Sequence, residues 1–342
     1  MDLTGHLLYI DITQVCGIGC NFCMYADKHQ TGASMVLSDQ ARANLRALIN
    51  DPAVKRISVS GEGEPLNNIK TFHEILGLST GGRAFEFITS GFLPHEQLAA
   101  FYDKTNALAQ ANGDSCNIRL SSDSYHIEKV KHRAHGFSAR YWIEHQPGAL
   151  RFSFRSVDTD RAFTRRFLLD EFTSNGVTAR LSAGTTLQDE LVVGDVSFGI
   201  EYKNHVHPHS LQPGQYLDLF AYIGAIEARY EKPFTLGSLN RGAVSNGMDV
   251  TIKPNGDVHF YGAETVALGN MHTDELSWPG LAARLQDDPL ARRLYTVPFV
   301  DLIGKITDDP IARNAIRRAN NPYWLIKELV GSQNLLHKMA SA

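Results

Sequence analysis

The sequence lacks long apolar runs and lacks a strong excess of charge of either sign. None of its apolar stretches reaches the roughly 18 residues of a membrane-spanning helix. The formal net charge is -4 over 342 residues, which gives no basic footprint for nucleic acid or for an anionic membrane surface. The first residues, MDLTGHLLYIDIT, show no basic segment ahead of an apolar one and predict no secretory signal. We therefore expect neither a membrane protein nor a nucleic-acid-binding protein.

Cysteine is scarce, and its distribution is uneven. Three of the 4 cysteines, Cys16, Cys20 and Cys23, lie in the segment CGIGCNFC. A disulfide framework uses an even number of cysteines in a small secreted chain, so clustered thiols here predict a reducing, cytoplasmic location. A structural zinc site closes four ligands, whereas three thiolates leave one coordination position open. Taken alone, the spacing still allows a zinc site, a redox pair or buried apolar cysteines.

The first half of the sequence alternates between β-rich apolar runs and helix-like stretches. Ser38 is a plausible N-cap for one of the helices, and Gly176 is a plausible end of another. The runs lie at residues 7–13, 55–60, 84–90, 116–121, 149–155 and 177–183. Six strands that alternate with helices predict an α/β fold with a parallel sheet, and such sheets bind ligands at the carboxyl ends of their strands.

After about residue 190 the pattern becomes antiparallel. A helix is expected near 214–229, and Asn255-Gly256 between alternating runs predicts a tight hairpin. The sequence from about residue 279 onward predicts helices. We therefore expect a first domain over 1–190 and a second, α+β domain with a helical tail over 191–342.

The three clustered cysteines directly follow the first expected strand. Their CxxxCxxC pattern resembles that of the radical S-adenosylmethionine (radical SAM) superfamily. The resemblance implies a partial (β/α)6 barrel and one [4Fe–4S] cluster whose fourth iron binds S-adenosylmethionine (AdoMet). Thiolates suit such a cluster because they are soft, anionic ligands. It also implies that Phe22 and Tyr25 contribute to cofactor binding, with Phe22 packing on the adenine.

A second motif follows the second expected strand. Glu62-Gly63-Glu64-Pro65 resembles the GGEP element of the same superfamily, with Glu62 in place of the first glycine. The element implies a turn that receives the ammonium group of the cofactor through backbone carbonyls and a carboxylate. An ordinary Gly-Pro turn is the alternative interpretation.

Polar residues end two further strands and carry weaker parts of the resemblance. Ser121 and Asp123 follow the fourth strand, where superfamily members present polar groups to the ribose. Ser153 or Arg155, at the end of the fifth, is a candidate for the cofactor carboxylate, which arginine is well shaped to bind. Each is equally consistent with a solvated polar residue at a strand end.

The second domain resembles a twitch or SPASM extension without its metal site. In residues 250–278 the hairpin and the Leu-Gly-Asn element are present, but Tyr261 stands where a cysteine is expected, and no cysteine follows. This predicts one cluster and no auxiliary cluster. Cys116 opens the fourth strand, at the end away from the ligand, and we expect it to be buried and inert.

Three histidines remain without an assigned role. Alternation places His205, His207 and His209 on one face of a strand, but Pro208 interrupts pairing. A metal site, a substrate-facing surface and a polar loop all remain open.

The resemblance implies an enzyme that cleaves AdoMet reductively to a 5′-deoxyadenosyl radical. We expect this radical to abstract hydrogen from a small organic substrate or short peptide in natural-product or cofactor biosynthesis. With one cluster, the expected reaction is that of a lyase, epimerase, isomerase or carbon–carbon bond-forming enzyme, and flavodoxin or ferredoxin is the expected electron donor. The alternatives are a non-catalytic Fe–S binding or sensor protein and a radical SAM enzyme that modifies RNA, the latter disfavoured by the acidic charge balance.

Overall fold

The computed structural model describes residues 5–21, 23, 32–205, 211–212, 214–236, 247–261 and 263–341. The chain divides into two compact units. The α/β unit comprises Ile10–Leu37 and Arg56–Lys203, and the helix-rich unit comprises Met1–Tyr9, Ser38–Lys55 and Asn204–Ala342. In the described part of the chain, no helix is long and apolar enough to cross a membrane.

The α/β unit alternates strands with helices, as the sequence predicts. Its strands, two of which begin in the other unit, are β1 (His6–Asp11), β2 (Val54–Ser60), β3 (Ala84–Thr89), β4 (Ser115–Ser121), β5 (Leu150–Val157), β6 (Arg180–Ala183), β7 (Gln188–Val193) and β8 (Val196–Lys203). Its helices are η1 (Pro65–Asn68), α2 (Ile69–Leu76), α3 (His95–Asn112), α4 (Ser124–Ile127), α5 (His135–His145), η2 (Asp158–Asp160) and α6 (Arg161–Ser174).

The strands of this unit follow the order β1-β2-β3-β4-β5-β8-β7-β6. Neighbouring strands from β2 to β5 are parallel, and β8 is parallel to β5. The first five predicted strands are thus confirmed, but the prediction of 177–183 as the sixth parallel strand is wrong. That segment forms β6, which is antiparallel to β7 at the edge of the sheet.

The β7–β8 hairpin explains why residues 177–183 do not form the sixth parallel strand. It turns at Gly194, whose φ of 57° suits glycine, and it brings β8 alongside β5 with Ile200 opposite Phe154. Buried Phe198, Ile200 and Tyr202 alternate with more exposed residues along β8. Strand β7 spans the boundary predicted at residue 190 and β8 lies beyond it, and both belong to the α/β unit, where β8 pairs with β5.

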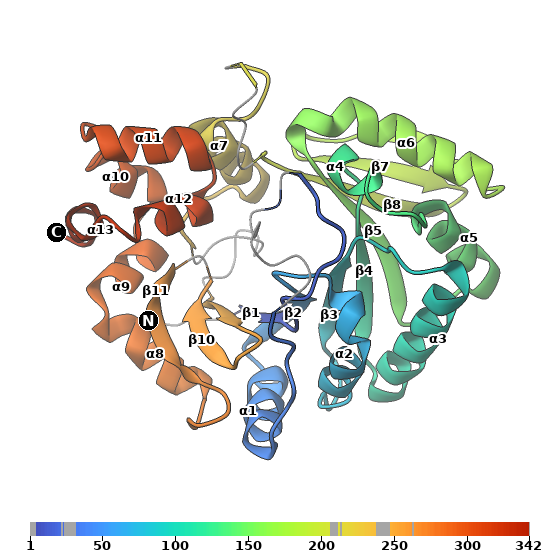
Figure 1. The fold of residues 1–342 in the computed structure, drawn as a ribbon, viewed down its shortest axis with the longest axis horizontal. Helices are drawn as coiled ribbons and strands as arrows, with labels where there is room; N and C mark the ends of the chain where they lie inside the picture. The colour runs from blue at the N-terminus through green and yellow to red at the C-terminus, as the bar shows by residue number, and fades with distance from the viewer. Residues whose placement is uncertain are drawn as a thin grey trace. The chain divides into compact units, whose positions relative to one another are not determined.

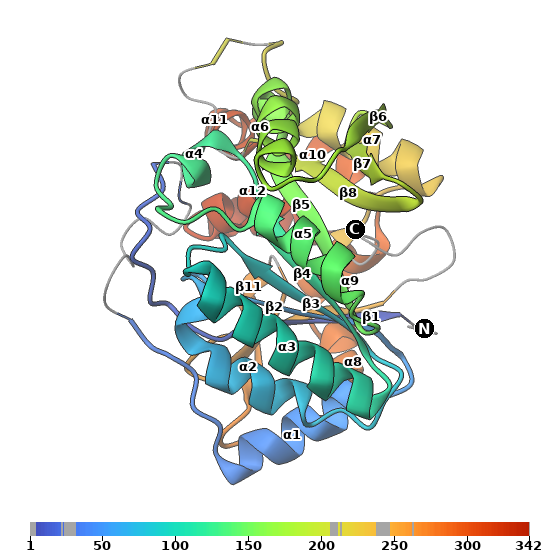
Figure 2. The ribbon, with the colours of Figure 1, turned by 90° about the vertical axis from the view of Figure 1, so that its right-hand side faces the viewer.

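Helices α2, α3, α5 and α6 cover one face of this sheet (Figures 1 and 2). The layer between them is rich in aromatic rings. Phe87 lies 4.5 Å from Phe72 and 4.9 Å from Phe101 between ring centroids, and Tyr102 lies 4.9 Å from Phe152. Buried aromatic pairs of this kind contribute large apolar areas, so this layer is the hydrophobic core of the unit.

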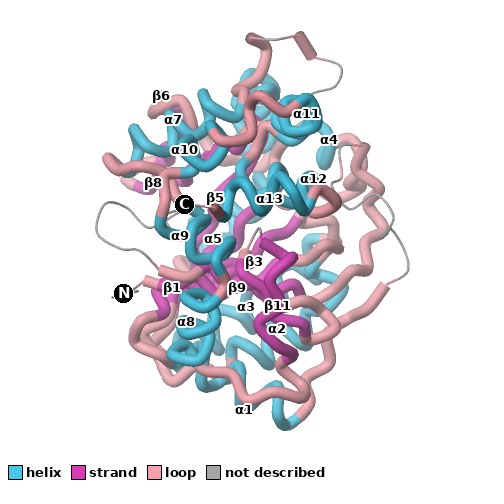
Figure 3. The backbone as a smooth tube through the Cα atoms, turned by 90° about the vertical axis from the view of Figure 1, so that its left-hand side faces the viewer, coloured by secondary structure: helices cyan, strands magenta, loops and turns pink. Residues whose placement is uncertain are grey.

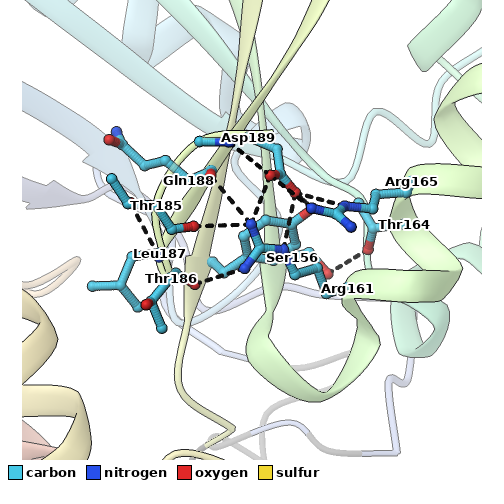
Figure 4. Close-up of polar contacts among 11 residues, drawn as sticks. Ser156, Arg161, Thr164, Arg165, Thr185, Thr186, Leu187, Gln188 and Asp189 are labelled. Carbon is cyan, nitrogen blue, oxygen red and sulfur yellow. Dashed lines mark hydrogen bonds and ion pairs between the residues drawn. The ribbon is translucent and has the colours of Figure 1, made fainter. Parts of the chain in front are cut away.

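A buried carboxylate fastens the β6–β7 hairpin to α6. Asp189 is 1% exposed and accepts hydrogen bonds from Arg161 at 2.6 and 3.0 Å, from Arg165 at 2.8 and 2.9 Å and from the Tyr202 hydroxyl at 2.9 Å (Figure 4). Burial by itself would raise the pKa of the Asp189 carboxyl, but the hydrogen bonds from Arg165, Arg161 and Tyr202 hold that pKa well below its usual range.

Asp189→Asn is therefore expected to lower the free energy of unfolding. The loss should be about 2 to 3 kcal/mol, less than for a fully buried pair because both guanidinium groups are partly exposed. The folded-state pKa is depressed, so this stabilisation is present above about pH 4 and is lost as the pH falls through the folded-state value. Urea unfolding at several pH values checks the result, and exposed Asp195→Asn is the matched control. Equal stability of Asp189→Asn and wild type at pH 7 would contradict it.

The helix-rich unit contains a short antiparallel sheet, α1 and the described helices that follow residue 204. Its strands are β9 (Asp249–Ile252), β10 (Asp257–Phe260) and β11 (Ala263–Asn270). Its helices are α1 (Asp39–Asn50), α7 (Leu219–Tyr230), α8 (Trp278–Asp287), α9 (Pro289–Thr296), α10 (Phe299–Gly304), α11 (Pro310–Ala319), α12 (Pro322–Leu329) and α13 (Gln333–Ala340). Helices α8 and α9 lie beside the β9–β11 sheet (Figures 1 and 3).

Local signals in this unit behave as the sequence predicts. Ser38 caps α1 by accepting a hydrogen bond from the backbone N–H of Ala41 at 3.2 Å. The predicted hairpin is β9–β10, and Gly256 in its turn has a φ of 90°. The third strand β11, antiparallel to β10, was not predicted.

Tyr261, the residue at the expected cysteine position, lies between β10 and β11. Its ring centroid is 5.1 Å from that of Tyr9 and 4.5 Å from that of Tyr323, and its backbone N–H donates to the Asp249 carbonyl at 2.7 Å. The position is therefore occupied by a packed aromatic side chain.

Candidate active site

The cysteine loop leaves the end of β1 in the α/β unit. Cys16, Cys20 and Cys23 are half-buried, and the Cys23 N–H donates to the Cys20 carbonyl at 3.1 Å. Burial raises the pKa of the Cys16 thiol, a backbone hydrogen bond at Ile18 opposes this, and the charges of Glu64, Cys20 and Cys23 raise it further. The three thiols and the Glu64 carboxylate thus share one electrostatic environment. Within the described residues, no group of three or more His, Cys, Asp or Glu side chains is arranged to hold a metal ion.

The Gly-Glu-Pro turn holds the backbone of this loop. The N–H of Gly63 donates to the Thr13 carbonyl and that of Glu64 donates to the Val15 carbonyl, both at 2.9 Å. A Cβ atom on Gly63 would lie 2.3 Å from the Val15 oxygen, so only glycine allows the two backbones to approach this closely. The turn that follows β2 therefore holds Val15, the residue next to Cys16, in place.

Two asparagines after the turn hold the same loop, and sequence reasoning missed them. Asn67 donates to the Val15 carbonyl at 3.0 Å, and Asn68 donates to the Ile12 and Met35 carbonyls at 2.8 and 3.1 Å. The signal was present in the sequence, because paired asparagines that follow a turn often bond to backbone groups.

Glu62 and Glu64 carry the carboxylates of the turn. Glu62 is 8% exposed and accepts from the Gln14 amide at 2.7 Å. Glu64 is 4% exposed and accepts four hydrogen bonds, from Leu66 N, Thr89 Oγ1, Ser90 N and Ser90 Oγ, at 3.1, 2.5, 2.9 and 2.7 Å. Its acceptor sites are thus engaged in joining the turn to the end of β3. Its expected contact with the cofactor ammonium stays a prediction.

The segment after β4 places an acid beside an imidazole, and the imidazole contacts a thiol of the cysteine loop. Both oxygens of buried Asp123 lie 2.8 to 2.9 Å from His126 Nδ1. Burial lowers the pKa of His126, but the charge and hydrogen bond of Asp123 and a hydrogen bond with Cys20 raise it to about 10. Asp123 thus favours the charged form of His126, which lies beside Cys20, one of the clustered thiols. The sequence had indicated Ser121 and Asp123 but not His126; Ser121 ends β4, and its carbonyl lies 3.0 Å from His135 Nε2.

Charged and polar side chains line the face of the sheet that the helices do not cover. Ser153 accepts from Asn117 at 2.8 Å, and Arg155 donates to Glu201 at 2.7 Å. Two further links connect β2, β3 and β4: Ser58 donates to Glu86 at 3.0 Å, and Arg119 donates to Glu86 at 3.1 Å. Ser153 and Arg155 thus already bind partners within the protein, and their expected contact with the cofactor carboxylate stays a prediction.

Some of the expected residues lie outside the described part of the chain, namely Phe22, Tyr25, His207 and His209. His205 is described and is 5% exposed. Cys116 is 0% exposed near the start of β4, and burial raises the pKa of its thiol far above the usual value. The prediction that Cys116 is buried away from the carboxyl end of its strand is confirmed.

No family model and no curated protein matches the sequence. Among solved structures, native anSMEcpe with bound AdoMet and Cp18Cys peptide is similar at a TM-score of 0.53 and 14% identity, over 98% of this chain and 99% of that one. His6-tagged anSMEcpe with bound AdoMet is similar at a TM-score of 0.52 and 15% identity over the same shares. BtrN in complex with AdoMet and 2-DOIA aligns with 45% of this chain and 58% of its own at a TM-score of 0.30 and 17% identity.

The likeness to anSMEcpe spans nearly the whole of both chains, including the α/β unit and the helix-rich unit. At this sequence identity the comparison concerns architecture. The chain therefore has the fold of anSMEcpe.

Proposed function

We propose that the chain is a radical SAM enzyme in which Cys16, Cys20 and Cys23 hold a single [4Fe–4S] cluster. The observation that supports this proposal most strongly is the three-cysteine loop at the end of β1, in a fold shared with an AdoMet-bound protein. Three thiolates that lie in one electrostatic environment suit the soft irons of such a cluster. When bound, the cluster would supply the electron that cleaves AdoMet to a 5′-deoxyadenosyl radical.

The residues around the loop would orient the cofactor and tune the thiols. The Gly63 and Asn67 contacts fix the loop backbone, and His126 lies beside Cys20 with a hydrogen bond to it. Because the Glu64 carboxylate is engaged with Leu66, Thr89 and Ser90, the backbone carbonyls of the turn are the better candidates for the AdoMet ammonium. The remaining candidates for cofactor contacts from the sequence are Phe22, Tyr25, Glu62, Pro65, Ser121, Asp123, Ser153 and Arg155.

The reaction that we propose conserves or lowers the oxidation level of the substrate. Tyr261 packs between Tyr9 and Tyr323 where an auxiliary-cluster cysteine was expected. Without a second cluster as electron acceptor, the outcomes that fit best are those of a lyase, an epimerase, an isomerase or a carbon–carbon bond-forming enzyme in a biosynthetic pathway.

The proposed partners are a small-molecule or short-peptide substrate and a flavodoxin or ferredoxin. The native anSMEcpe structure contains a peptide, which supports the peptide option. A cavity of about 350 Å³ is lined by Gly17 and Ile18 of the cysteine loop and by Lys129, Lys131 and His132. Lys129 and Lys131 beside that loop suit the acidic surface of an electron donor. Clustered free thiols support a cytoplasmic location.

The test is anaerobic reconstitution with iron and sulfide, followed by reduction with dithionite in the presence of AdoMet. The proposal expects 5′-deoxyadenosine and methionine in equal amounts, separated by liquid chromatography and identified by mass. Iron and sulfide that bind without any AdoMet cleavage would instead favour an Fe–S sensor. A salt-dependent mobility shift with RNA would favour RNA as the substrate.

A further inference from the structure

One face of the parallel sheet has an unusual composition. Strands of a parallel sheet are normally covered on both faces and read as continuous apolar runs. Here β4, β5 and β8 alternate, with apolar residues toward the helices and polar ones on the other face. We call this the polar face, and it comprises Arg56, Ser58, Ser60, Glu86, Asn117, Arg119, Ser121, Ser153, Arg155, Glu201 and Lys203.

Hydrogen bonds across neighbouring strands show that these side chains form one layer. Glu86 on β3 accepts from Ser58 on β2 and from Arg119 on β4. Arg155 on β5 donates to Glu201 on β8, two residues before Lys203 and on the same side of that strand. The layer therefore crosses the sheet from β2 to β8.

The charges of this layer do not balance. Its cations are Arg56, Arg119, Arg155 and Lys203, and its carboxylates are Glu86 and Glu201. Arg155 and Arg119 each bind one of the two carboxylates. The layer therefore carries two positive charges in excess of its own anions.

Two cations of the layer, Arg119 and Lys203, have donors without a partner among the described residues. Arg119 is 9% exposed, and its Nε–H is buried without a hydrogen-bond partner. In the described part of the chain, no carboxylate lies within ion-pair distance of the Lys203 ammonium group. Burial and the nearby charges of Arg155 and Arg119 lower the pKa of Lys203 to about 8, although Asp123 and Cys23 oppose this. A buried donor without a partner, as at Arg119 Nε, and a half-buried cation without a carboxylate partner, as at Lys203, are both costly in a ligand-free protein.

We propose that the polar face binds an anionic group of the substrate, a carboxylate or a phosphate, between Arg119 and Lys203. The inference rests on the proposed function, because it names the substrate class for that site. An anion in this position satisfies the Arg119 Nε–H and balances the excess charge. The carboxylate of AdoMet is a second source of the same chemistry, so the experiment has to separate the two.

The experiment measures binding of inorganic phosphate to the purified protein by calorimetry at constant ionic strength. Lys203→Met is expected to weaken binding at least about tenfold, because it removes one charge-assisted hydrogen bond and one excess charge. Glu201→Gln is expected to tighten binding several-fold, because it raises the excess charge by one. Lys203→Arg keeps the charge and should bind like wild type, and exposed Lys104→Met on α3 is the matched control.

The folded stability of the variants separates binding from a structural role. Lys203→Met removes an unpaired cation, so its melting temperature without phosphate should equal or exceed that of wild type. A large drop would show that Lys203 stabilises the fold and would overturn the proposal. Equal phosphate affinities in wild type, Lys203→Met and Glu201→Gln would overturn it as well.

Titration of the AdoMet-saturated protein with phosphate shows whether the site binds an anionic group of the substrate or the carboxylate of AdoMet. The proposal expects phosphate to bind with unchanged affinity, because the two ligands occupy different places. Competition between AdoMet and phosphate would assign the site to the cofactor and overturn a substrate role. AdoMet binding is measured in the same preparation, so its failure counts against the proposed function and is distinguishable from a failure of the anion site.

Discussion

Replacement of any one of Cys16, Cys20 and Cys23 by alanine is expected to reduce 5′-deoxyadenosine formation to the background rate. A cubane cluster held by three thiolates has no spare protein ligand, since the fourth cysteine of the chain is buried near the start of β4. Under the proposed function, loss of one thiolate would therefore remove the cluster that supplies the electron for AdoMet cleavage. Iron content after anaerobic reconstitution should fall from about four atoms per chain to a small fraction of that.

Cys116→Ala is the matched control for these variants. Its side chain is 0% exposed, so the substitution should cost about 1 kcal/mol of stability and leave iron content and turnover intact. Loss of iron in Cys116→Ala would contradict the proposed ligand set. Wild-type iron near eight atoms per chain would contradict the single-cluster interpretation of Tyr261.

Gly63→Ala is expected to reduce 5′-deoxyadenosine formation at least about a hundredfold while the protein remains folded. The new Cβ would lie 2.3 Å from the Val15 oxygen and 2.6 Å from the Gln14 carbonyl carbon, which are backbone atoms and not flexible side-chain ends. The loop must move to relieve this contact, and Cys16 is the next residue along it. Displacement of a reacting group by about 1 Å is enough for a loss of this size.

The measurements for Gly63→Ala are iron content, AdoMet binding and deoxyadenosine formation, with circular dichroism as the check on folding. Gly224→Ala is the control, because no atom lies within 4 Å of its added Cβ and its helical position favours alanine. That variant should equal wild type in activity. Full activity of Gly63→Ala would mean that the loop does not depend on its contact with the turn.

Glu64 shows how the structure changes the interpretation of a motif. The sequence indicated a carboxylate facing the cofactor, since the Gly-Glu-Pro turn resembles a cofactor-binding element. In the structure, the carboxylate bonds to Leu66, Thr89 and Ser90, and the last two residues end and follow another strand. Thr89 and Ser90 are 25 and 26 residues away from Glu64 along the chain, so no local pattern could have indicated these two partners.

The polar face was visible in the sequence only in part. Segments such as NIRLS, FSFRS and FGIEYK alternate polar and apolar residues, which by itself predicts a strand with two different faces. The charged layer exists because Arg155 lies opposite Glu201 and Arg119 lies near Glu86. These pairs depend on strand order and register, which are properties of the assembled sheet.

The sequence by itself determined the features that depend on short-range spacing. Alternating apolar runs specified the first five strands, Ser38 specified the start of α1, and the three-cysteine loop specified where the chemistry is expected. Only the tertiary structure decided that β8 and not β6 lies beside β5, and that Gly63 and Asn67 hold the loop. The physical reason is that propensity, capping and side-chain periodicity act within a few residues, whereas strand order and backbone approach depend on packing between distant segments.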